Sequence, residues 1–268
     1  MPGGYPFGWD ICNGTSVGSI NTGTGGTTVT ASGSANTKGS WTQLIAASAS
    51  DCVMLGIMLC AGATQVAVDI GVGGSGNEVV VIPNLMTTMG VVVSSDTTLV
   101  PLAIPAGTRI AARCASPTGS ATVAVALMLF DGGFAQMEGL AGADAIGFVG
   151  ASTQGTAIAL TNNAKGSYVQ MIAATARDYL GFLVGIDSQN GNAGAGHVVN
   201  LDIAVGGSGS EVIVIPNHSI SWWNGLLWGE LTPFYSVAVP AGTRMAVRGA
   251  SVGGGALTMG VTLYGFYQ

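Results

Sequence analysis

Hydrophobic and polar residues alternate with a period of two in many short segments of this chain. Within residues 65–72, every second residue is valine or isoleucine, and the residues between them are polar or small. Residues 123–129 and 257–264 alternate in the same way. Such alternation is typical of a strand with one buried face. About seven such runs in each half, separated by Gly, Ser, Asn and Pro, predict an all-β protein built from antiparallel β-sandwiches.

The same sequence occurs twice. Residues 69–84 read DIGVGGSGNEVVVIPN, and residues 202–217 read DIAVGGSGSEVIVIPN, at an offset of 202 − 69 = 133. The pattern KGS followed by an aspartate and the pattern PAGTR with a second arginine also return in the second half. We therefore expect two tandem sandwiches that arose by internal duplication, each a jelly roll or a related antiparallel fold.

The repeat sets the expected domain boundaries. An N-terminal arm that crosses a neighbour or stays mobile should cover residues 1–27. The first β-sandwich repeat should cover 28–134, a glycine-rich linker 135–150 and the second repeat 151–268. The offset is 178 − 51 = 127 before residues 189–194 and 133 after them. That loop is therefore predicted to be the main insertion in the second repeat.

Composition excludes several functional classes. Only 7% of the residues are charged and 48% are hydrophobic, which is the opposite of a disordered chain. The uncharged stretches are broken by Gly, Ser, Thr and Pro, and the first residues show no basic region followed by an apolar core, so we expect no membrane partner. A net charge of −6 with seven basic residues argues against nucleic-acid binding.

No catalytic or cofactor site is predicted. Residues 71–76 match G-x-G-x-x-G, but a strand follows instead of a helix, so the glycines should form a hairpin turn. His197 and His218 occur only in the second half and are expected to be loop histidines of no special role, because neither a nucleophile elbow nor a metal-binding spacing is present. We expect neither enzymatic activity nor a cofactor or metal. The cysteines, Cys12, Cys52, Cys60 and Cys114, all lie in the first half and are expected to be buried thiols.

Most of the charges belong to the repeat. Twelve of the 20 charged residues form six matched pairs, and among them we single out a charge set. Its members are Asp69, Glu78, Arg109 and Arg113 in the first half and Asp202, Glu211, Arg244 and Arg248 in the second. The two arginines of each half share strand parity, about 13 Å apart. They form either an anion clamp or, as we favour, structural pairs with the acidic residues of their own copy.

The two halves differ most after the shared IPN sequence. There the second half contains three of the five tryptophans of the chain, Trp222, Trp223 and Trp228. Tryptophan is enriched at subunit contacts, stacks on sugar rings and also fills cores. These residues are our candidates for an interface or a binding loop, with core packing as the alternative.

Three motifs carry a resemblance to a known class of proteins. They are KGSWTQLIAAS at residues 38–48, the repeated GGSG-x-EV sequence that ends in IPN, and the closing PAGTR pattern. The chain resembles virion structural proteins of tailed bacteriophages over residues 38–130 and 165–267. The resemblance implies a structural part of a particle and no catalytic residues.

These observations lead to three functional hypotheses. The first is an oligomeric capsid decoration or cement protein, a homotrimer in the simplest arrangement, whose partners are itself and the major capsid protein or another virion protein. It would be located in the virion and assembled in the host cytoplasm. The second is a phage tail, fibre or receptor-binding component with a glycan-binding loop. A glycan-cleaving virion enzyme is third, because no paired carboxylates stand out.

Overall fold

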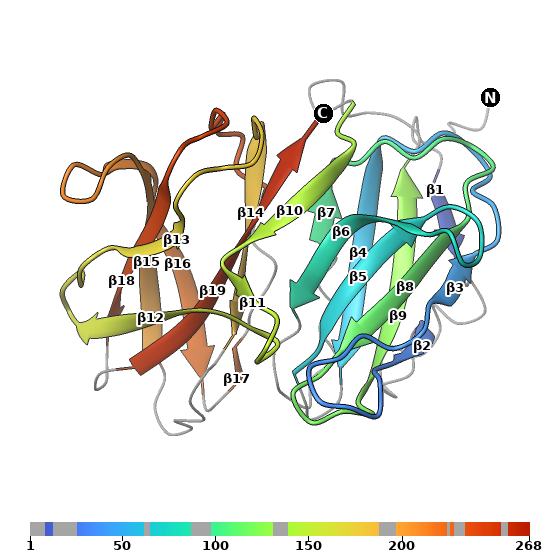
Figure 1. Ribbon diagram of the computed structural model, residues 1–268, viewed down its shortest axis with the longest axis horizontal. Coiled ribbons are helices and arrows are strands. Elements are labelled where there is room, and N and C mark those ends of the chain that lie inside the picture. The colour runs from blue at the N-terminus through green and yellow to red at the C-terminus, as the bar shows by residue number, and fades with distance from the viewer. Residues whose placement is uncertain are drawn as a thin grey trace, which may run out of the picture.

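The computed structural model describes residues 9–12, 26–61, 65–86, 98–130, 139–187, 197–223, 226–227, 234–252 and 257–268. Strands and turns make up this part of the chain, with no helix among the described residues, so the predicted all-β class is confirmed. The strands form two lobes that lie side by side (Figure 1). Within the described residues, no helix is long and apolar enough to cross a membrane.

The first lobe is a sandwich of two antiparallel sheets. Its strands are β1 (Trp9–Cys12), β2 (Thr27–Thr30), β3 (Thr42–Ile45), β4 (Met54–Ala61), β5 (Ala67–Val72), β6 (Val79–Met86), β7 (Thr98–Val100), β8 (Ile110–Ala115) and β9 (Thr122–Phe130). One sheet has the order β1-β9-β4-β7, with β2 also paired to β9, and the other has the order β3-β8-β5-β6. Strands β2 to β9 are therefore distributed between the two layers, and ordered within each, as in a jelly roll.

The second lobe repeats this pairing. Its strands are β10 (Gly142–Ile146), β11 (Phe148–Val149), β12 (Gln154–Asn162), β13 (Val169–Ile172), β14 (Gly181–Asp187), β15 (His197–Val205), β16 (Val212–Trp223), β17 (Leu226–Leu227), β18 (Met245–Val252) and β19 (Leu257–Tyr267). Strands β12 and β14 flank β19 as β2 and β4 flank β9, and β13, β18, β15 and β16 follow one another as β3, β8, β5 and β6 do. A short parallel pairing of β12 with β18 joins the two layers into one ten-stranded sheet.

The repeated sequence forms the same hairpin in both lobes. Val72 pairs with Val79, and Val205 pairs with Val212. Both hairpins shift register at equivalent places, and Asn84 and its counterpart Asn217 have positive φ angles of 53° and 47°. The glycine-rich segment leads from strand to strand, as predicted, so no helix follows it to bind a phosphate.

Two segments differ from their expected roles. Residues 135–150 are expected to be a linker, yet β10 and β11 lie within them. Strand β10 pairs with β19 and therefore belongs to the second sandwich. In the N-terminal arm, β1 pairs with β9 of the same chain in the same way. Glycine-rich composition indicated a linker, but the backbone hydrogen bonds to a long neighbouring strand order these segments. Residues 189–194, the predicted insertion, lie outside the described residues.

The lobes pack against each other through apolar side chains. The hydrophobic core of the first lobe includes Leu183, Tyr264 and Phe266 of the second lobe. These side chains lie on the face of β14 and β19 that points away from the core of their own sandwich. The buried Tyr264 hydroxyl donates to the Asn84 carbonyl at 2.6 Å and accepts from the Met86 N–H at 3.0 Å. The junction is thus a packed interface with satisfied hydrogen bonds.

Candidate functional site

The first cluster of repeated charges lies on the outer face of the β3-β8-β5-β6 sheet. Asp69 of β5 is opposite Arg113 of β8 and has the parity opposite to the core residues Val68 and Ile70. Its Oδ1 accepts from Lys38 Nζ at 2.7 Å and from the Asn84 N–H at 2.8 Å. Its Oδ2 accepts from Arg113 Nε at 2.9 Å. Both carboxylate oxygens are therefore used inside the lobe.

The second lobe builds the same cluster. Asp202 is opposite Arg248, and it accepts from Lys165 Nζ at 2.9 Å, from the Asn217 N–H at 3.0 Å and from Arg248 Nε at 3.0 Å. The guanidinium of Arg248 lies 4.6 Å from the centre of the Tyr168 ring. In the first lobe, the Arg113 guanidinium lies at the same distance from the Trp41 ring. Each cluster thus combines two cations, one carboxylate and an aromatic ring.

The remaining arginines of the charge set stabilise the two hairpins. Arg109 Nη1 donates to Glu78 Oε1 at 2.8 Å and to the Gly73 carbonyl at 3.1 Å. The Glu78 carboxylate also accepts from the Gly76 N–H at 3.0 Å. In the second lobe, Arg244 binds Glu211 at 3.1 Å and the Gly206 carbonyl at 2.9 Å. The arginine–glutamate pair therefore spans the turn in both copies.

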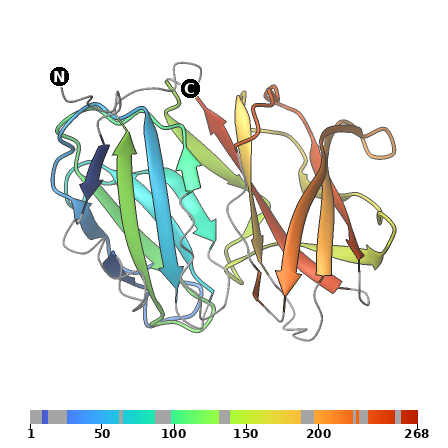
Figure 2. The same ribbon diagram turned by 180° about the vertical axis from the view of Figure 1, so that it is seen from behind.

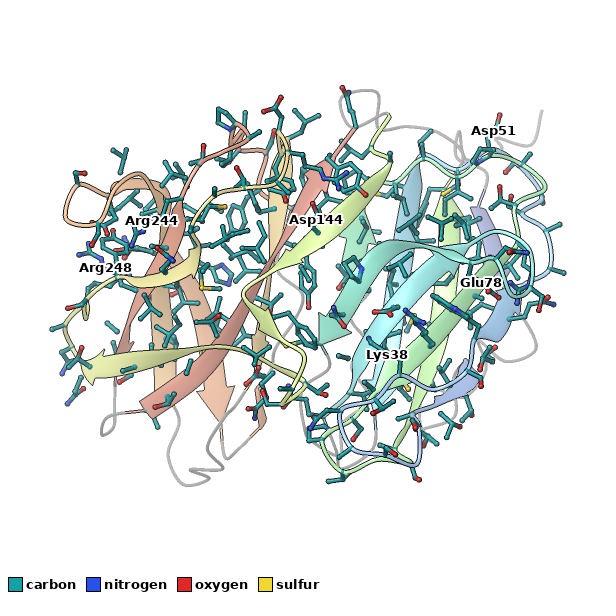
Figure 3. All side chains as sticks on the ribbon, viewed as in Figure 1. Lys38, Asp51, Glu78, Asp144, Arg244 and Arg248 are labelled. Atoms are coloured by element: carbon teal, nitrogen blue, oxygen red, sulfur yellow. The ribbon has the colours of Figure 1, made fainter. Side chains whose placement is uncertain are left out.

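These positions place the charges on separate surfaces. Figure 3 shows Lys38 and Glu78 on the first lobe, and Arg244 and Arg248 at the end of the second lobe that lies away from the first. An anion clamp formed by arginines would need guanidinium groups that are not already bound to carboxylates. Each arginine of the charge set instead donates to an aspartate or glutamate of its own copy. This geometry favours the structural interpretation.

The environment shifts the pKa values within the clusters. Burial lowers the pKa of the Lys38 ammonium below its ordinary value, against the opposing effect of Asp69. Burial alone would raise the pKa of Asp202, but hydrogen bonds from the Asn217 N–H, Lys165 and Arg248 bring it below the ordinary value. The Asp202 carboxylate is therefore stabilised in its charged form as an acceptor, and it is a poor general base.

His218 is a buried residue of the second lobe. Its Nδ1 lies 2.7 Å from the Tyr235 hydroxyl oxygen, and the two rings make an edge-to-face contact. Burial lowers the pKa of His218 to about 4, so the ring is neutral at neutral pH. Among the described residues, Nε2 has no hydrogen-bond partner. The sequence predicted a loop histidine at this position, whereas the structure places it in strand β16 facing the interior.

Asp187 is a buried carboxylate that the sequence reasoning missed. It has no exposed surface, it ends β14, and it shares the parity of Leu183, which points toward the first lobe. The Gly155 N–H donates to Oδ2 at 2.6 Å, and burial raises the pKa of Asp187 to about 6. The sequence does contain a sign of its burial: Asp187 continues an otherwise apolar strand, at the position where the first lobe has Cys60.

The other candidates are only partly placed. Trp222 and Trp223 belong to β16, where they pair with β17, but their side chains lie outside the described residues, as do Trp228 and the side chain of His197. Cys52 and Cys114 are buried thiols, as predicted, whose sulfurs lie 2.9 Å from the Met54 carbonyl and 3.6 Å from the Val29 carbonyl. In the part of the chain that the structure describes, no three His, Cys, Asp or Glu side chains are grouped to hold a metal.

Comparisons with known proteins add little to this geometry. No family model matches the chain, and no curated protein matches it. Among solved structures, it is similar to one titled "Structure of PNGF-II in C2 space group", with 8% sequence identity and a TM-score of 0.32. The match covers 84% of this chain and 59% of the other, so the chain spans less than two thirds of that protein's length. A likeness this weak carries no argument about function.

Proposed function

We propose that this protein is a virion structural protein and, more specifically, an oligomeric capsid decoration or cement protein. The observation that carries the proposal is that the basic residues are paired within the chain. The chain has seven lysines and arginines, and every one of them forms an ion pair with a carboxylate of the same chain. No basic side chain is left over to bind phosphate, which disfavours nucleic acid as the partner.

A surface of this kind is suited to permanent protein contacts. Charged groups are costly to desolvate, and interface cores are correspondingly poor in charge. Here the charges are few and the basic ones are already paired, and large apolar side chains are exposed, with Val79 at 64% and Val212 at 63%. Such a chain loses little free energy when its surface is covered by a neighbour. The resemblance of the motifs to phage virion proteins supports a virion as the place of these contacts.

The proposed partners are further copies of the same chain and the major capsid protein or another virion protein. Three chains of two similar jelly rolls would present six similar modules, which fits a position between hexamers of a shell. We expect the purified protein to be oligomeric at micromolar concentration by light scattering. A map of the particle by electron microscopy tests the location directly: density for the paired lobes on the outer shell is the expected result, and their absence from the shell contradicts it.

A receptor-binding role is the alternative, favoured by the tryptophan-rich sequence in and after β16. The Trp222–Leu227 pairing turns this segment into a hairpin at the end of the sheet. Replacing Trp223 with Ala distinguishes the roles. Loss of oligomer or particle binding with an intact fold supports a subunit contact, and global destabilisation supports core packing. Binding on a glycan array that disappears only in the variant supports a tail, fibre or receptor-binding component.

A further inference from the structure

The junction inside the chain joins two different surfaces. On the second lobe, it is the outer face of β10, β19 and β14, which includes Tyr264 and Phe266. On the first lobe, it is strand β6, the edge of the β3-β8-β5-β6 sheet. The approach is close, because a Cβ atom added to Gly142 of β10 would lie 3.1 Å from the Val81 carbonyl oxygen. Figure 1 shows β10 on the side of the second lobe that adjoins the first.

The second lobe has the same edge, but its side chains are more exposed. Strand β16 matches β6 in sequence and register, and residues 212–217 keep the apolar sequence of residues 79–84. Val81 is only 8% exposed and Val80 is half-buried. Their counterparts Val214 and Ile213 are both more exposed, Ile213 at 41%. Between residues 212 and 219, no described strand pairs with the outer edge of β16.

The first lobe has the complementary face, which no described strand covers. In β4 and β9, the residues that point away from the core are mostly apolar: Met54 is buried, and Met58, Ala126, Met128 and Phe130 are half-buried. Leu99 of the adjacent β7 is 41% exposed. Figure 2, seen from behind, shows β4 and β9 toward the viewer with no other described strand in front of them. The equivalent face of the second lobe is the one that the internal junction buries.

We propose that the β16 edge of one copy docks on the outer face of β4 and β9 of another copy, and so repeats the junction between the lobes in head-to-tail fashion. The partner is a second copy because this chain already shows how the two surfaces pack. They are different patches, so the contact is heterologous and generates a ring where the rotation closes. Both are free of charged side chains at the named positions, so neither carries a charge to be desolvated. This inference rests on the oligomeric role proposed above and names its interface.

Two variants and a mixing experiment test this arrangement. Ile213→Glu places a charge on the β16 edge, and Met128→Glu places one on the β9 face. Val252→Glu is the matched control, because Val252 is 43% exposed and belongs to β18, which pairs with β15 and not with β16. Light scattering should give a closed multiple of the 26.6 kDa chain for the native protein and the control, and single chains for both variants. Circular dichroism and thermal melting confirm that each variant is folded.

Mixing the two folded variants is the decisive step. Each keeps one intact surface, and these surfaces are complementary, so the mixture should form dimers although neither variant associates alone. Variants that remain oligomeric, or a mixture that stays monomeric, would overturn the interface while leaving the virion role standing. A native monomer that still decorates particles overturns the interface alone. A native monomer that is also absent from the particle map overturns both proposals.

Discussion

Strands β6 and β16 are nearly the same sequence in the same hairpin, yet their surroundings differ. In the first lobe, this edge is covered by β10, and Val81 is buried. In the second lobe, Val214 and Ile213 at the same edge are partly or largely exposed. The apolar pattern is therefore retained where the chain itself does not use it. An apolar edge strand that is covered in one lobe and exposed in the other is typical of a surface that binds a partner, which agrees with the proposed contact between copies.

The interiors of the lobes also differ. Leu55 pairs with Val100 in the first lobe, and the corresponding bridge in the second joins Phe182 to Tyr235, whose hydroxyl contacts His218. The first lobe has the buried Leu85 at the position of His218. Among the described residues, a histidine thus enters the core of the second lobe only. Acid should act mainly on the second lobe and on the junction.

The largest effect is expected from the charge clusters that the lobes share. Asp202→Ala leaves Lys165 and Arg248 without their carboxylate, and Asp69→Ala does the same to Lys38 and Arg113. Removing one partner of a largely buried pair costs about 3 kcal/mol. Urea unfolding should show similar losses for both variants, with Ser167→Ala as an exposed control. A large loss in one lobe only would show that the two clusters are not equivalent.

Asp187, which the second lobe has and the first lacks, should make stability depend on pH. Its folded pKa of about 6 exceeds the ordinary 3.8, so the folded state holds a proton that the unfolded chain has released. Stability therefore falls as pH rises through this window. Asp187→Asn should gain about 3 kcal/mol over the native chain at pH 7 and nothing below pH 4. Asp178→Asn, a surface control, should gain nothing. A loss of stability at pH 7 would mean that the carboxylate is needed in its charged form.

His218 should act in the opposite direction. Its folded pKa of about 4 lies below the ordinary 6.5, so the unfolded state binds the extra proton and stability falls as pH drops through this range. At pH 5 the native chain should have lost about 2 kcal/mol relative to pH 7 through this group. The double variant His218→Leu with Tyr235→Phe removes both polar partners and should abolish that loss. Thermal melting at the two pH values checks it, and an unchanged acid sensitivity would contradict it.

The smallest effect is expected at the hairpin arginines. Arg109→Ala and Arg244→Ala each remove a bond to a glutamate and to a glycine carbonyl, so both should lower the melting temperature modestly and by similar amounts. The conservative variants Arg109→Lys and Arg244→Lys should lower the melting temperature less, since lysine keeps the charge but lacks the several donors of the planar guanidinium group. Unchanged stability combined with lost binding of an anionic ligand would instead support the anion clamp.

The sequence was informative where the chain repeats itself. Alternation and the paired GGSG sequences were sufficient to predict all-β sandwiches and the hairpin turns, and the repeated charges indicated pairs between arginines and acidic residues of one copy. The choice of a jelly roll depended on long-range strand pairing, which has no local signal. Composition was misleading at residues 142–146. This glycine- and alanine-rich segment forms β10 because its backbone pairs with β19. Asp187 was missed because its burial comes from the packing of the two lobes.

The most direct test is an electron-microscopy map of the purified oligomer at a resolution that separates the strands. We predict that β16 of each chain lies on β4 and β9 of the next, in the same relation that β6 has to β14 and β19 within one chain. A map in which copies meet through identical patches, or in which the β16 edge faces solvent, would contradict it.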